Sequence, residues 1–155
     1  MGSKLSLFLS LILFIAAPAL SQGLTVNTAR GIDFGDQIFP GIEKKISHKD
    51  ALAARFEVTG EAGREVQILF QLPNYLQDVS GNTLSIAFSS TDAAYSTDSN
   101  GQFAAIAFDP KTGVVTSLSS EGKLYIWLGA TVLPLNTQPG NSYSGDIILD
   151  VTYTN

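Results

Sequence analysis

The chain has 155 residues, of which 45% are hydrophobic and only 15% are charged, and its formal net charge is -5. These values predict one folded domain with a substantial core, and they exclude a disordered chain. The sequence has no basic patch and no Cys, which disfavours a nucleic-acid partner and excludes disulfides and thiolate chemistry.

Residues 1–21 have the pattern of a secretory signal peptide. Lys4 supplies a positive charge, an apolar run extends to Ala17, and small residues, including Ala17 and Ala19, define candidate cleavage sites. The apolar run is shorter than the roughly 20 residues of a membrane-spanning helix. We therefore expect an exported domain over residues 22–155, in the periplasm, on the cell surface or outside the cell, with no membrane span.

Apolar and polar residues alternate along most of the remaining chain. A period of two is typical of half-buried strands, and turns rich in Gly, Pro, Asn and Asp separate the runs. The pattern predicts an all-β domain of the sandwich type. In chain order the predicted strands are LTVNT and GIDFGD (24–36), ARFEVTG (54–60), EVQILFQL (65–72), NTLSIAFSS (82–90), QFAAIAFD (102–109), GKLYIWLGATVLPL (122–135) and NSYSGDIILDVTYTN (141–155).

The charged segment GIEKKISHKDALAARF (41–56) interrupts this pattern, and we interpret it as a polar loop or an edge strand that crosses between sheets. It contains His48, the only His of the chain. A zinc site or a hydrolase triad would need further ligands or a nucleophile at fixed spacing, and none is present. We therefore expect a solvated His48, no catalytic, cofactor or metal-binding residue, and no enzymatic activity.

Two further patterns bear on ligand binding. Asp98, Asn100 and Gly101 resemble the beginning of a calcium loop, but the third ligand and the distal Glu are missing, which favours a simple turn. Tyr125 and Trp127 share one face of the longest predicted strand, where exposed rings could stack on a carbohydrate. Because both faces of that strand are apolar, we favour burial in the core.

The closing segment is the most regular of all. Five side chains, Tyr143, Ile147, Leu149, Val151 and Tyr153, fall on one parity and polar residues fall on the other. This pattern predicts a core strand at the very end of the chain. It also raises the question of what covers the outer edge of that strand.

The order of four motifs resembles a bacterial secreted family called domain of unknown function 4402, which is similar to spore coat protein U and to chaperone–usher pilins. The resemblance covers roughly residues 24–153. The motifs are LTVNTARGIDFG, ARFEVTGEAGREVQILF, LGATVLPL and the closing GNSYSGDIILDVTYTN.

This resemblance implies an immunoglobulin-like β-sandwich with a surface, fimbrial or adhesive role, and a periplasmic chaperone or sister subunits as partners. Pilins of this kind lack a last strand, and a partner strand fills the groove. On that basis Leu149, Val151 and Tyr153 line a strand-pairing groove. Only Gln22 and Gly23 precede the first predicted strand, so a donor arm is missing and a self-complete domain stays open. The alternative is a stand-alone carbohydrate- or calcium-binding module.

Overall fold

The computed structural model describes residues 23–155, and this part of the chain is all-β with antiparallel sheets and no α-helix. The predicted signal peptide lies outside the described residues. Within them, one 3-10 turn, η1 (Gly101–Ala104), interrupts the strands. The strands are β1 (Thr25–Arg30), β2 (Lys44–Ile46), β3 (Ala54–Thr59), β4 (Glu65–Gln71), β5 (Tyr75–Gln77), β6 (Thr83–Ala87), β7 (Ala93–Ser96), β8 (Ile106–Phe108), β9 (Val114–Ser117), β10 (Lys123–Leu128), β11 (Ala130–Leu133) and β12 (Ile148–Tyr153).

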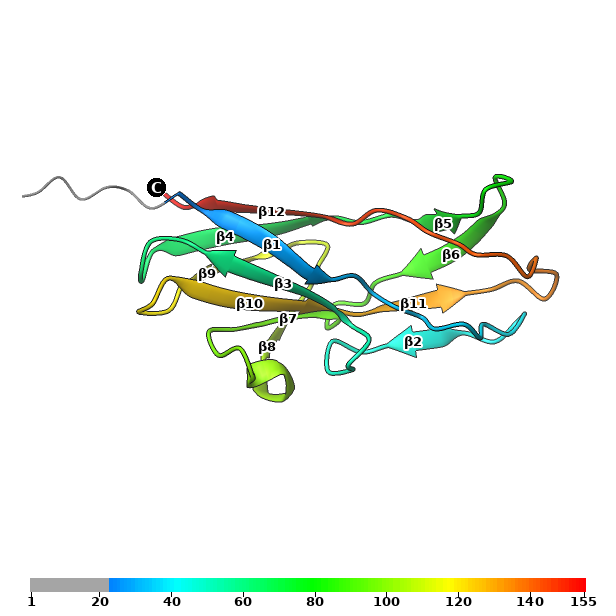
Figure 1. Cartoon of the computed structure of the whole chain (residues 1–155), viewed down its shortest axis with the longest axis horizontal. Coiled ribbons are helices and arrows are strands. Elements are labelled where there is room, and N and C mark those ends of the chain that lie inside the picture. The colour runs from blue at the N-terminus through cyan, green and yellow to red at the C-terminus, as the bar shows by residue number, and fades with distance from the viewer. Residues whose placement is uncertain (1–22) are drawn as a thin grey trace, which may run out of the picture.

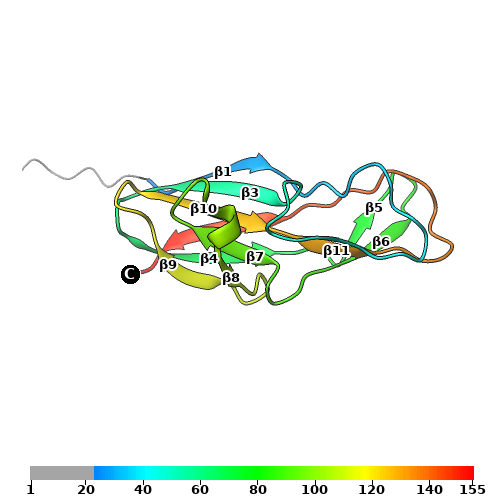
Figure 2. The ribbon, with the colours of Figure 1, turned by 90° about the horizontal axis from the view of Figure 1, so that it is seen from below.

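The described strands form three sheets. Their orders are β1-β3-β10-β7-β8, β2-β11-β6-β5 and β12-β4-β9. Figures 1 and 2 show an elongated molecule in which the five-stranded and three-stranded sheets occupy one half and the four-stranded sheet occupies the other. No helix in residues 23–155 has the length and apolar character needed to cross a membrane.

The long predicted strand at 122–135 is divided at Gly129. Its first part, β10, lies in the five-stranded sheet between β3 and β7, and its second part, β11, lies between β2 and β6 in the four-stranded sheet. At Gly129 the backbone of residues 46–48 comes very close, because a Cβ there would lie 2.8 Å from the His48 nitrogen and closer still to the Ile46 carbonyl oxygen. One segment therefore joins two sheets, and only glycine fits at the junction.

One apolar core runs beneath the three sheets. Phe56, Val58, Leu124 and Ile126 enter it from the five-stranded sheet, and all are at most 4% exposed. Further core side chains come from the three-stranded sheet (Val66 and Ile68) and from the four-stranded sheet (Leu84, Ile86, Ala130 and Val132). Each of these falls on the apolar parity expected from the alternating sequence.

The closing strand was expected over residues 141–155 but begins only at Ile148, and in the described chain the residues before it contain only the isolated bridge between Ser144 and Gln77. The expected strands differ from the structure in two further segments. Residues 31–36 continue extended after β1 but join no ladder within the described residues, and residues 101–104 form η1 in place of a strand. Both segments contain Gly, and the second follows the Asp98 turn, so local turn chemistry overrides the alternation there. The short strands β5, β7 and β9 were not expected, because three or four residues carry little periodic signal.

The prediction that His48 is solvated is wrong. Its side chain is only 8% exposed, and its Nδ1 lies 3.0 Å from the carbonyl oxygen of Thr91. The amide of Gln102 in η1 donates to the carbonyl oxygens of His48 and Asp50 at 2.7 and 2.9 Å. Residues distant in the sequence thus surround His48, and no local pattern around it could indicate this burial.

Candidate binding groove

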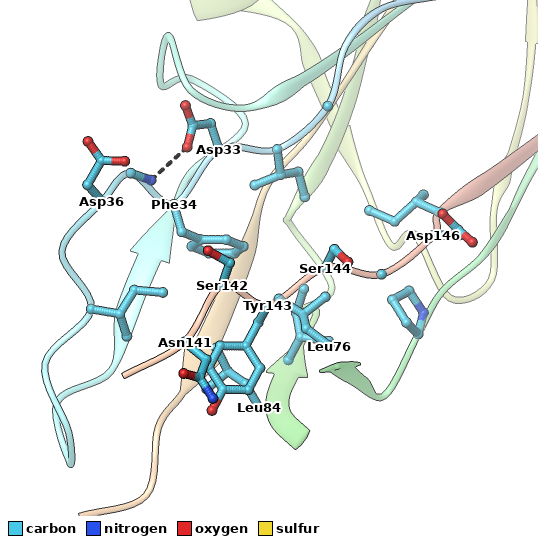
Figure 3. A pocket seen from close by; sticks show the side chains of 18 of the residues that line it. Asp33, Phe34, Asp36, Leu76, Leu84, Asn141, Ser142, Tyr143, Ser144 and Asp146 are labelled. Carbon is cyan, nitrogen blue, oxygen red and sulfur yellow. Dashed lines mark hydrogen bonds between the residues drawn. The ribbon is translucent and has the colours of Figure 1, made fainter. Parts of the chain in front are cut away.

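A cavity of about 820 Å³ opens between two extended segments of the chain. One wall is residues 31–40, which follow β1, and the other is residues 138–147, which precede β12. The floor between them is apolar, with Phe56, Leu76 and Leu84 from the core. We call this cavity, with its two walls, the groove (Figure 3).

The first wall leaves the five-stranded sheet where β1 ends. The Asp33 carboxylate accepts a hydrogen bond from the Gly35 N–H at 2.7 Å, and Gly35 has a φ of 71°, which glycine adopts without strain. This turn places Ile32 and Phe34 against the core, half-buried, while Asp33 and Asp36 stay exposed. The wall therefore presents apolar side chains inward and carboxylates outward.

Few backbone bonds hold the first wall. The Asp33 N–H donates to the Leu52 carbonyl at 3.0 Å, and the Gly41 N–H just beyond the wall donates to the Leu135 carbonyl at 3.1 Å. In the described part of the chain, no ladder includes residues 31–40. Most backbone N–H and C=O groups of this wall therefore have no ladder partner among residues 23–155.

The second wall is fixed to the hairpin formed by β5 and β6. Gln77 and Ser144 exchange two backbone hydrogen bonds, at 2.8 and 2.9 Å. The Gln138 amide donates to the Tyr143 hydroxyl at 2.7 Å, and that hydroxyl donates to the Pro139 carbonyl at 2.9 Å. These bonds hold the Tyr143 ring over the floor of the groove, as Figure 3 shows.

Asp78, in the β5–β6 turn, is hydrogen-bonded to this second wall through Asn141. Its carboxylate accepts hydrogen bonds from the Asn82 amide at 2.7 Å, from the Asn141 amide at 2.6 Å and from the backbone N–H groups of Asn82 and Ser80. The bond from the Asn82 side chain is the main cause that lowers the pKa of Asp78 from 3.8 to about 2, and burial opposes it. The ionised carboxylate is therefore the form that the fold favours.

Asp78→Asn should make the protein less stable at neutral pH, and the deficit should close in acid. Because the pKa of Asp78 is lowered on folding, its contribution is complete above the unfolded value of 3.8 and is lost as the pH falls towards about 2. Urea unfolding at pH 7, 4 and 2 measures this gap. Asp98→Asn, in an exposed turn, serves as the control, and an equal deficit for Asp78→Asn at every pH would contradict the assignment.

The three predicted groove residues lie further along the same face. Leu149, Val151 and Tyr153 are half-buried and pack against the core, and they pair with Phe70, Ile68 and Val66 of β4. The cavity itself ends at Ile147. The predicted residues therefore continue the row of Tyr143 and Ile147 without lining the cavity.

Tyr153 has a defined role in the fold. Its hydroxyl accepts a hydrogen bond from the Glu61 N–H at 2.7 Å, and the Arg64 guanidinium lies 4.9 Å from its ring centroid. A Cβ at Gly60 would lie 2.5 Å from this hydroxyl. The end of the chain is thus fastened to the turn between β3 and β4.

The other groove residues were only partly visible in the sequence. Tyr143 and Ile147 share the parity of the predicted groove residues, so the alternation of the closing segment already indicated them. Residues 31–36 of the first wall were predicted as a strand, and the alternation within them includes Ile32 and Phe34. Nothing local indicated that the two walls face each other, because about a hundred residues separate them.

Of the two alternative ligand sites, the aromatic pair has one buried and one half-buried ring, and the Asp98 segment forms a turn. Trp127 is only 1% exposed, which confirms the predicted burial, and the Arg55 guanidinium lies 5.5 Å above the half-buried Tyr125 ring. The Asp98 carboxylate accepts a hydrogen bond from the Asn100 N–H at 2.9 Å, as in a simple turn. Within residues 23–155, no three His, Cys, Asp or Glu side chains gather in a metal-binding group.

Comparison of the chain with protein-family models and with curated proteins found no match. The resemblance of its four motifs to the secreted family therefore stays a prediction.

Proposed function

We propose that the chain is an exported, immunoglobulin-like β-sandwich that acts as a non-catalytic surface or structural subunit, pilin- or coat-like or adhesive, and associates by β-strand addition. The observation that carries the proposal is the groove between residues 31–40 and 138–147, with its apolar floor and sparsely bonded first wall. Its partners would be a periplasmic chaperone or sister subunits that supply a strand.

The neighbouring strand supports this proposal. Within the described residues β12 is an edge strand, because its sheet has the order β12-β4-β9. An added strand gains affinity from main-chain hydrogen bonds and specificity from side chains that fill pockets at alternate positions. The groove is suited to both, since its cavity has an apolar floor and, in residues 23–155, the backbone of the first wall joins no ladder.

The sandwich assignment has separate support. Inward side chains of the five-stranded sheet, such as Phe56, and of the three-stranded sheet, such as Ile68, belong to one core. The rings of Phe56 and Phe70 lie 5.9 Å apart, which brings β3 and β4 together across that core. Two antiparallel sheets that share one core are typical of sandwich domains.

Strand addition predicts that an extended peptide stabilises the protein. The probe is a capped peptide of about ten residues in which Val alternates with Ser, since that length matches an ordinary strand. Added in excess to the chain without residues 1–21, it should raise the melting temperature by several degrees through linkage. The same peptide with N-methylated Ser residues cannot donate along one edge and should have no effect.

Adjacent isoleucines provide matched variants for the same experiment. Ile147 is half-buried and lines the groove, whereas Ile148 is 49% exposed on the opposite face. Ile147→Ser should weaken peptide binding, and Ile148→Ser should leave it unchanged. If neither peptide alters the melting temperature and titration calorimetry shows no binding, strand addition at this groove is excluded.

A further inference from the structure

The two walls of the groove and the adjoining part of β12 carry charges of one sign. Residues 31–40 contain Asp33 and Asp36, residues 138–151 contain Asp146 and Asp150, and neither stretch contains Lys or Arg. Four of the 14 acidic residues of the chain therefore lie in these two stretches. The rim is thus acidic around an apolar floor.

Asp33, Asp146 and Asp150 lie on the outward parity, and Asp36, which shares the parity of Phe34, is exposed because it follows the turn at Gly35. In Figure 3, Phe34 and Tyr143 point into the cavity, whereas Asp33, Asp36 and Asp146 lie at its margins. A strand inserted between the walls would also alternate, with one set of side chains on the floor and the other set outward. Its outward side chains would then be cross-strand neighbours of carboxylates on both sides.

In residues 23–155 none of these four carboxylates forms an ion pair, although Arg30 and Lys44 lie near the first wall. Arg30, at the end of β1, donates through its Nε to the Ala53 carbonyl at 2.7 Å, and Lys44 donates through its Nζ to the Gln37 carbonyl at 3.1 Å. The ion pairs of the described residues all lie elsewhere. They are Lys45 with Asp92, Arg55 with Glu57, and Arg64 with Glu61.

We infer that the groove selects a cationic strand, in which apolar residues alternate with Lys or Arg. This inference rests on the proposed strand addition and names the chemistry of the partner segment. The apolar half of such a strand would fill the floor over Leu76 and Leu84. Its cationic half would pair with the outward carboxylates, and opposite charges on neighbouring strands attract whereas like charges repel.

Three peptides of the same length test the inference. In each, Val occupies the inward positions, and the alternate positions are Lys, Ser or Glu. At low salt the Lys peptide should bind roughly tenfold more tightly than the Ser peptide, as expected for a few cross-strand ion pairs, and the Glu peptide should bind most weakly. Titration calorimetry gives the dissociation constants, and about 0.5 M salt should remove most of the difference.

A variant and a matched control assign the effect to the groove. Asp36→Asn/Asp146→Asn removes one carboxylate from each wall and should bring the Lys and Ser peptides within about twofold of each other. Asp98→Asn/Glu121→Gln removes the same charge from exposed turns outside the groove and should keep the tenfold preference.

The possible failures can be told apart. Equal binding of all three peptides would overturn the cationic selection and leave strand addition intact. Binding of no peptide would overturn strand addition itself, and the inference with it. A Lys preference that survives in Asp36→Asn/Asp146→Asn would show that net charge, and not the groove, attracts the peptide, which also overturns the inference.

Discussion

Gly129→Ala is expected to destabilise the protein by about 3 kcal/mol, at the upper end of the usual cost of overpacking. A methyl group at this position would meet the backbone of Ile46, Ser47 and His48, and backbone atoms cannot rotate away as a side chain can. The added group would separate β11 from β2, whose pairing begins at Ala130 and Ile46. It would also strain the 2.8 Å hydrogen bond from the Gly129 N–H to the Asp92 carbonyl.

Urea unfolding measures this effect, and Gly140→Ala is its control. Gly140 is exposed, and a Cβ there would meet nothing within 4 Å. The control should change stability by no more than about 0.5 kcal/mol. Should Gly129→Ala prove as stable as Gly140→Ala, the close approach of residues 46–48 to the β10–β11 junction would be refuted.

Deletion of residues 150–155 should prevent stable folding. The deletion removes Val151 and Tyr153 from the inner face and the ladder that pairs Asp150 to Tyr153 with Leu69 to Val66. It would also uncover Val66 and Ile68, which have no exposed surface in the intact protein. Loss of this much apolar burial and pairing costs several kcal/mol, comparable with the roughly 5–15 kcal/mol that stabilises a domain.

Circular dichroism and gel filtration distinguish a folded product from an unfolded or aggregated one. Removal of Asn155 alone is the matched control, because this residue is exposed and lies beyond the ladder. Tyr153→Phe gives an intermediate case, since it keeps the ring but leaves the Glu61 N–H without its acceptor, at a cost of roughly 1–2 kcal/mol. A cooperative unfolding transition in the long deletion would show that β12 is dispensable.

The long, half-buried strands could be predicted from the sequence. In β3, β4, β6 and β12 the apolar residues alternate because one face meets the core, and this alternation is written in the local sequence. Turn chemistry was equally local, since Gly-containing turns were predicted between the strands, and Gly113 and Gly122 there have φ values of 74° and 72°.

Other features could not be predicted because they depend on contacts between distant residues. The burial of His48 requires Thr91 beside it and Gln102 over its carbonyl, and neither is near it in the chain. The segment after β1 alternates like a strand, yet residues 31–40 join no ladder in the described chain. Alternation in the sequence indicates that one face of a segment is buried, but it does not indicate which strand pairs with that segment through backbone hydrogen bonds.

By itself, the sequence determined an all-β chain that ends in a strand with Leu149, Val151 and Tyr153 on its inner face, because local alternation and turn residues encode both. Only the tertiary structure decided that Gly129 divides one strand between two sheets and that two walls far apart in the chain enclose an acidic-rimmed groove. Such features depend on which backbone segments approach each other, and that choice is made by the packing of the whole core.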